Sequence, residues 1–227
     1  RISASGVSEG SATLGNHYGS AATSGGGFVW MGTRNGVFKI TEGTATSVNF
    51  GGSGTITGVA YAPNSQKFYA TEGSNFLRFD STTSGATASS TTARGGTTDE
   101  LKIQTVDGVE YVVAAGAYGI KRFVASTGAL DPNFTTITGT FTALAIDPTD
   151  NSILGGTSTN VFRYPANGGT GSAALLPSNK AVNSMAVDSK GRIVIGTSSS
   201  GSGVMRFSAT GTPDAIFNAN TNVAYSV

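Results

Sequence analysis

Few side chains in this sequence are suited to nucleophilic or acid–base chemistry. The 227 residues include one histidine, His17, and no cysteine. A Ser-His-Asp triad needs an imidazole held in a fixed position. His17 lies in a polar, irregular stretch, so we expect no triad. The lack of cysteine excludes disulfides, zinc–thiolate sites and thiol nucleophiles.

Carboxylates are the remaining candidates for catalysis. Glycoside hydrolysis requires two cooperating carboxyl groups. Asp99 and Glu100 are adjacent residues near a predicted inner strand, and adjacent strand residues point to opposite faces of the sheet. The two acids therefore cannot act as a pair. We expect no catalytic residues and no cofactor, with a glycosidase that uses Asp99 or Glu100 as the weaker alternative.

Aspartates recur at predicted turns. Asp131 and Asp214 follow Thr-Gly pairs, whereas Asp147 and Asp188 follow short apolar runs. Aspartate at a turn usually accepts hydrogen bonds from nearby backbone N–H groups. The run from Asp147 to Asn151 has oxygen ligands that suit Ca²⁺, but it lacks the alternating acidic spacing of a calcium loop. We therefore expect turn capping and no metal site.

A basic residue recurs inside short apolar runs about 40 residues apart, which is the spacing of four-stranded propeller blades. The positions are Lys39, Arg78, Arg122, Arg163 and Arg206. A ring of such cations could bind an anion. Alternatively, each side chain packs its stem between blades while its charged end reaches water or a carboxylate. Repetition in every blade favours the packing role.

Each run with a basic residue is predicted to be the third strand of a blade. Three further kinds of strand accompany these third strands. A second strand precedes each basic run, at 28–31, 68–70, 111–114, 153–155 and 193–195. Inner strands with alternating small residues are predicted at 57–61, 101–104, 142–146 and 183–187, and suit the crowded centre of a propeller. Weaker outer strands are predicted at 48–50, 134–137, 173–176 and 215–217, and a loosely specified one within 82–98.

The pattern predicts an all-β fold, a single β-propeller of about five four-stranded blades over residues 28–227. Residues 1–27 are predicted to be an irregular N-terminal arm. The final run, Val223–Val227, resembles an inner strand. We expect it to close the ring by pairing beside Phe28–Met31. The alternative is that His17–Ala22 supplies that inner strand.

The composition of the chain restricts the kinds of partner and the location that we expect. Charged residues make up 12% of the chain and the net charge is +1, which argues against a nucleic-acid partner. No run of 18 apolar residues occurs, so we expect no membrane span. Abundant Gly, Ser, Thr and Asn favours an extracellular or cell-surface location. The chain starts at Arg1, from which we expect that an upstream segment was removed. Asn133-Phe134-Thr135 is a glycosylation sequon.

The segment Phe28–Ile40, FVWMGTRNGVFKI, resembles the propeller repeats in periplasmic sensor regions of bacterial two-component regulators. The segments Gly191–Phe217 and Ala117–Phe134, each with a Thr-Gly-x-x-Asp turn, resemble bacterial surface-protein propeller repeats. The size is similar to that of five-bladed tachylectin-like lectins. Those lectins are rich in repeated tryptophan, whereas this chain has only Trp30, which we expect to pack between blades.

Hairpin tips are the predicted ligand surface, because loops carry function on a rigid scaffold. The turns between second and third strands vary from copy to copy and offer Arg34, Asn35, Asn75, Tyr118 and Asn160. Such side chains suit sugar hydroxyls and ring stacking. The sequence thus predicts a non-catalytic recognition or adhesion module that binds a glycan or surface polymer. A structural subunit of a surface layer or filament, with other copies of itself as partners, is the alternative.

Overall fold

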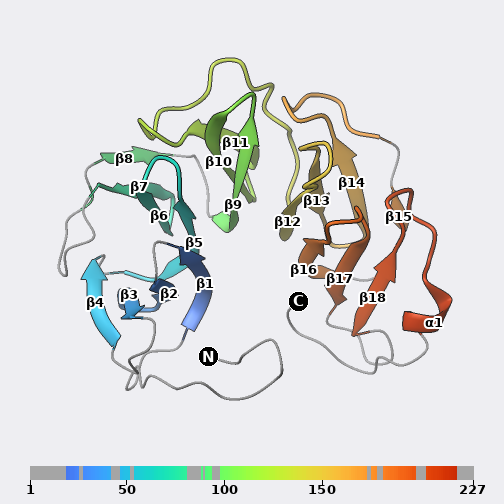
Figure 1. Cartoon of the computed structure of the whole chain (residues 1–227), viewed down its shortest axis with the longest axis horizontal. Helices are drawn as coiled ribbons and strands as arrows, with labels where there is room; N and C mark the ends of the chain where they lie inside the picture. Colours follow the sequence, from blue (N-terminus) through green and yellow to red (C-terminus); the bar gives the residue numbers. More distant parts are fainter. Residues whose placement is uncertain are drawn as a thin grey trace. The chain divides into compact units, whose positions relative to one another are not determined.

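The computed structural model describes residues 19–25, 28–41, 47–51, 54–80, 88, 90–93, 98–172, 175–177, 181–197 and 203–218. The chain divides into two compact units. Figure 1 labels the strands of both. One consists of Arg1–Thr98 with Ala125–Gly128, and the other of Asp99–Val124 with Ala129–Val227.

The first unit contains two four-stranded sheets in which each strand pairs with the next in the chain. One sheet consists of β1 (Gly19–Gly25), β2 (Phe28–Thr33), β3 (Gly36–Thr41) and β4 (Ser47–Gly51). The other consists of β5 (Ile56–Ala62), β6 (Lys67–Glu72), β7 (Asn75–Phe79) and β8 (Ser90–Ala93). All the pairings in both sheets are antiparallel.

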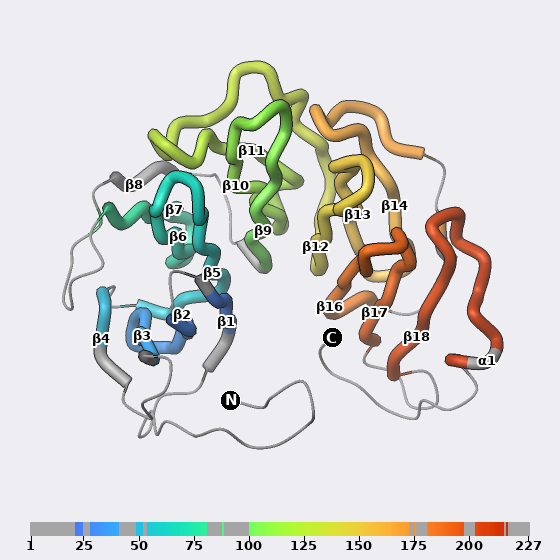
Figure 2. The backbone as a smooth tube through the Cα atoms, in the orientation of Figure 1, coloured from blue at the N-terminus to red at the C-terminus, as the bar shows by residue number. Residues whose placement is uncertain are grey.

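The second unit repeats this hairpin path in three sheets, which Figure 2 follows along the backbone. The first sheet has β9 (Thr98–Val106), β10 (Val109–Gly116) and β11 (Gly119–Val124). The second has β12 (Ala143–Ile146), β13 (Ile153–Gly156), β14 (Asn160–Tyr164) and the two-residue β15 (Leu176–Pro177). The third has β16 (Val182–Val187), β17 (Ile193–Thr197) and β18 (Val204–Phe207), followed by helix α1 (Ala215–Asn218).

The predicted second and third strands are present, as are the inner strands predicted at 57–61, 101–104, 142–146 and 183–187. The outer strands differ in part. Residues 48–50 lie in β4, and β8 falls within the low-complexity segment, as expected. Residues 134–137 form no regular strand and make only isolated bridges, among them Ile120 with Ile137. The strand predicted at 215–217 is wrong, because these residues lie in α1. The Asp214 carboxylate accepts a hydrogen bond from the Phe217 amide and so caps the helix.

The strand beside β2 also differs from our expectation. β1, at Gly19–Gly25, pairs with one edge of β2, and β3 pairs with the other. Both edges of Phe28–Met31 are thus occupied, so the predicted pairing with Val223–Val227 is wrong. The alternative, a strand near His17–Ala22, is closer to the observed structure. Val223–Val227 and residues 1–18 lie outside the described residues, and the predicted domain boundary at residue 28 stays a prediction.

Aromatic rings fill the core of the first unit. Trp30 is fully buried, with Phe50 4.6 Å and Phe68 4.7 Å away between ring centroids. Phe79 completes the cluster, 5.4 Å from Phe50. Trp30 therefore packs in the core between strands of both sheets, as the sequence predicted, and has no exposed ring face for a sugar.

Glycines let neighbouring sheets of the second unit approach closely. A methyl group placed on Gly156 of β13 would lie 2.9 Å from Val182 Cγ1 of β16 and 3.0 Å from Ala143 Cβ of β12. The distance to Val182 is shorter than real carbon contacts, and the distance to Ala143 is tighter than most of them. The same crowding occurs in the first unit, where Gly32 abuts Ile56.

Candidate functional site

The repeated basic residues lie on third strands β3, β7, β11, β14 and β18. The most buried of them is Arg122 of β11, whose side chain is only 2% exposed. Its Nε and Nη2 donate to Asp131 Oδ2 at 2.8 and 2.6 Å. Its Nη1 donates to Gln104 Oε1 at 3.0 Å and to the Ala166 carbonyl at 2.9 Å, and Nη2 also reaches Asn167 Oδ1 at 3.1 Å. All five guanidinium hydrogens are therefore used.

Neighbouring side chains complete the environment of Arg122. The ring centroids of Tyr111 and Phe134 lie 4.1 and 5.0 Å from Arg122 Cζ. Gln104 of β9 donates onward to the carbonyls of Asn151 and Ala166, at 2.7 and 3.1 Å. The cluster thus joins the sheet β9–β11 to loops of the sheet β12–β15 in the same unit.

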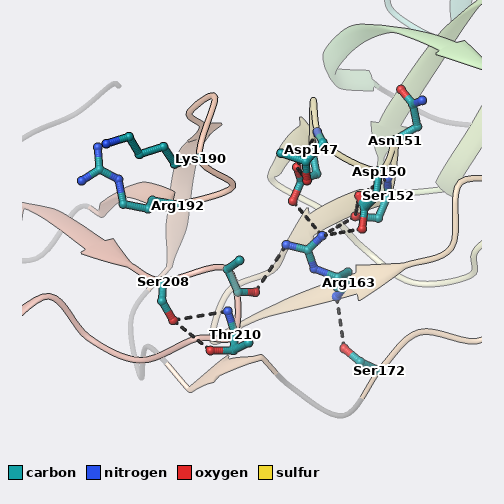
Figure 3. A network of polar contacts seen from close by, with 12 residues as sticks. Asp147, Asp150, Asn151, Ser152, Arg163, Ser172, Lys190, Arg192, Ser208 and Thr210 are labelled. Atoms are coloured by element: carbon teal, nitrogen blue, oxygen red, sulfur yellow. Dashed lines mark hydrogen bonds and ion pairs between the residues drawn. The ribbon is translucent and has the colours of Figure 1, made fainter.

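Arg163 of β14 makes a second cluster of this kind (Figure 3). Its Nη1 donates to Asp147 Oδ2 at 2.8 Å and to the Ser152 hydroxyl, both from the turn between β12 and β13. Its Nη2 lies 3.4 Å from the Ala209 carbonyl, in the loop that follows β18. The guanidinium therefore binds a carboxylate of its own sheet and a carbonyl of the next one.

Arg78 of β7 repeats the arrangement in the first unit. Its Nε and Nη2 lie 2.9 and 3.0 Å from the two oxygens of Asp80. Its Nη1 donates to the carbonyls of Ser126 and Thr127, which belong to the same unit and follow β11 in the chain. The positions after a third strand thus supply backbone carbonyl acceptors for Arg78, Arg122 and Arg163 alike.

Arg206 of β18 shares a local motif with Arg122. Its Nε and Nη2 donate to Asp214 Oδ2 at 2.9 and 2.6 Å, and its Cζ lies 4.5 Å from the ring centroid of Phe217. In both copies the aspartate amide donates to the arginine carbonyl at 2.9 Å. The sequence signal is Asp-x-x-Phe after a Thr-Gly turn. That pattern predicts a turn, but it does not indicate the bond to the preceding arginine.

Lys39 of β3 differs from the four arginines. Its ammonium lies 3.6 Å from the ring centroid of Phe28 and 5.7 Å from that of Trp30. A cation over aromatic faces is stabilised by the ring quadrupole. The five repeated cations therefore all make contacts within the fold, which supports the packing interpretation over a ring that binds an anion. We refer to the four arginine clusters as the arginine clamps.

The repeated aspartates each serve an arginine and their own turn. Asp131 Oδ1 accepts from the Asn133 amide, and Asp147 Oδ1 accepts from the Thr149 amide and hydroxyl. Burial acts to raise the pKa of Asp147, but the hydrogen bonds from Thr149 and the contact with Arg163 outweigh it and lower the pKa. The lowered pKa keeps Asp147 in the ionised form, as turn capping requires and general-acid catalysis does not.

Asp188 follows the same rule in the turn between β16 and β17. Its Oδ1 accepts from the Lys190 and Arg192 amides, both at 2.9 Å, and its Oδ2 accepts from Arg192 Nε at 2.6 Å. Desolvation acts to raise the pKa of Asp188, but these hydrogen bonds outweigh it and lower the pKa.

Glu100, one of the two acids considered for catalysis, has contacts within the fold. Glu100 Oε2 accepts from the Leu144 amide at 2.5 Å, and Oε1 lies 2.6 Å from Lys102 Nζ. Glu100 therefore links the inner strands β9 and β12. His17 lies outside the described residues. Within the part of the chain that the structure describes, no three His, Cys, Asp or Glu side chains are grouped as a metal site would require, and no helix is long and apolar enough to cross a membrane.

The predicted ligand residues all fall at turns between second and third strands. Arg34 and Asn35 lie between β2 and β3, and Asn75 begins β7, in the first unit. Tyr118 lies between β10 and β11, and Asn160 begins β14, in the second unit. The contacts of Asn35 and Asn160 include local ones, from the Asn35 amide to Thr33 Oγ1 and from Asn160 Nδ2 to Thr159 Oγ1. Their role in binding stays a prediction.

Comparison with known proteins supports the repeat fold. No protein-family model and no curated protein matches the chain. The crystal structure of the WD40 beta propeller domain of Doa1 is similar, with a TM-score of 0.68 and 17% sequence identity over 90% of this chain and 70% of that chain. At this identity the likeness shows the fold alone. The chain folds as all-β propeller repeats in mostly antiparallel sheets, and the bacterial families that its motifs resemble stay a prediction.

Proposed function

We propose that the chain is a non-catalytic recognition module at the cell surface or outside the cell, which binds a glycan or surface polymer. In this proposal the five sheets are the blades of one closed propeller. The turns between second and third strands form the binding surface, with Arg34, Asn35, Asn75, Tyr118 and Asn160 as contact residues.

The proposal is supported by the hydrogen bonds of the repeated aspartates. Asp131, Asp147, Asp188 and Asp214 each accept from an arginine side chain and from a backbone amide of their own turn. Carboxylates bound in this way stabilise the scaffold and do not form the acid–base pair of a glycosidase. Variation between copies is then concentrated at the hairpin turns, where recognition on a rigid scaffold is usually located.

A glycan array followed by thermal unfolding with the best ligand tests the proposal. A ligand that binds the folded protein raises its melting temperature with concentration. Substituting Tyr118→Ala or Asn160→Ala should abolish that rise without lowering the melting temperature of the free protein. Turnover of a chromogenic glycoside that is lost in Glu100→Gln would instead indicate the enzyme. Large regular particles without ligand, seen by electron microscopy, would indicate the assembly subunit.

A further inference from the structure

The turn between β16 and β17 presents two cations on a rigid backbone. Asp188 fixes the turn, because its Oδ1 accepts from the Lys190 and Arg192 amides at 2.9 Å each. Gly191 has a φ of 72°, which favours glycine. A methyl group built on Gly191 would lie 3.6 Å from Asp147 Oδ2, so the turn packs against the Arg163 clamp of the adjacent sheet.

Arg192 differs from the clamp arginines in how its guanidinium is used. Its Nε donates to Asp188 Oδ2 at 2.6 Å, and the side chain remains 40% exposed. Arg192 Nη1 and Nη2 have no hydrogen-bond or ion-pair partner among the residues that the structure describes. The same holds for the Lys190 ammonium. In Arg122, by contrast, all five donors are bound.

Figure 3 shows both side chains extending from the turn to the same side, away from Asp147. The bond from Nε to Asp188 orients the guanidinium so that its two terminal nitrogens remain for an incoming group. Two parallel N–H donors match the two oxygens of a carboxylate or sulfate. With Asp188 included, the turn carries one net positive charge, which complements a single negative charge.

We propose that Lys190 and Arg192 bind a singly charged oxyanion on a polymer, the carboxylate of a uronic acid or a sulfate ester. The proposal rests on the proposed function and specifies an anionic polymer as its ligand. Successive turns of an antiparallel sheet lie at opposite ends of its strands. This turn joins an inner to a second strand, so within the repeat it lies at the opposite end from the turns that carry Tyr118 and Asn160.

The test is binding of alginate oligosaccharides, dextran sulfate and neutral dextran to the folded chain, followed by amide chemical shifts. Alginate or dextran sulfate should shift the amides of residues 188–192 at low salt, and the shifts should shrink at high salt. The variant Arg192→Gln should weaken binding by about tenfold, since a charge-assisted bidentate contact is lost. Arg192→Lys keeps the charge but loses the fork, so its affinity should be intermediate.

Lys102→Gln is the matched control, because it removes one positive charge from a lysine already paired with Glu100. Equal weakening in Lys102→Gln, or unchanged affinity in a Lys190→Gln/Arg192→Gln variant, would overturn the proposal, as would a lack of binding to both anionic probes. Binding of only one of them identifies the anion as carboxylate or sulfate ester. Failure of the proposed function looks different: the anionic probes shift residues 188–192, but no probe shifts the amides of the Tyr118 and Asn160 turns.

Discussion

The arginine clamps should contribute to the free energy of unfolding according to how deeply each is buried. Arg122 gives the sharpest test. Its side chain is 2% exposed and that of Asp131 is 3% exposed. Removing one partner of a buried ion pair leaves the other charge buried without compensation, which costs about 3–5 kcal/mol. Arg122→Ala should therefore lower the melting temperature by about 6–20 °C, at about 2–4 °C for each kcal/mol in a chain of this size.

The matched comparison is Arg206→Ala. Arg206 binds Asp214 with the same pair of nitrogens, but the two side chains are 25% and 27% exposed. Solvent-exposed pairs contribute about 1 kcal/mol or less. Thermal and urea unfolding, followed by circular dichroism, give both free energies, and double-mutant cycles with Asp131→Ala and Asp214→Ala give the coupling within each pair. Equal losses in the two variants would refute the argument from burial.

Three further predictions concern packing, pH and a helix cap. Gly156→Ala should lower the free energy of urea unfolding by about 1–3 kcal/mol, because the new methyl group meets Val182 at 2.9 Å. An unchanged unfolding midpoint would show that the sheets can move apart without loss of stability. Because the pKa of Asp147 is lowered in the folded state, the ionised carboxylate contributes to the free energy of unfolding above about pH 4. This contribution is lost as the pH falls through the folded-state pKa. The stabilities of wild type and Asp147→Asn should therefore converge in acid, and a constant difference would contradict this. Asp214→Asn keeps an oxygen that can accept a hydrogen bond from the Phe217 amide, whereas Asp214→Ala does not. Asp214→Ala should therefore lower the free energy of chemical unfolding by about 1 kcal/mol more than Asp214→Asn. Equal losses in the two variants would exclude the cap.

The sequence pattern located most of the strands because their local signals agree with the fold. Apolar runs with period-two alternation, separated by Gly- and Asn-containing turns, mark β2, β3 and their counterparts. A strand at β1 was only the alternative prediction, at His17–Ala22, because Gly19–Gly25 has weak strand propensity and forms through pairing with β2. Helix α1 was missed because Asp214, which the pattern marks only as a turn residue, caps it.

The sequence predicted that each repeated cation packs its stem and directs its charged end to water or a carboxylate, but not which carboxylate or carbonyl it binds. Arg122 and Asp131 are nine residues apart, across a loop, and the spacing is eight for Arg206 and Asp214. No helix or strand period links such positions. The acceptors in the next sheet are backbone carbonyls such as those of Ala166 and Ala209. Carbonyls are present at every residue, so the sequence carries no signal for them.

The central claim is that the repeated cations hold the fold together while the turns recognise the ligand. The most direct test measures melting temperature and glycan affinity per folded molecule for Arg163→Ala and Tyr118→Ala side by side. We predict that Arg163→Ala melts lower and binds normally, whereas Tyr118→Ala melts normally and binds weakly. Loss of affinity in Arg163→Ala at an unchanged melting temperature would contradict the account.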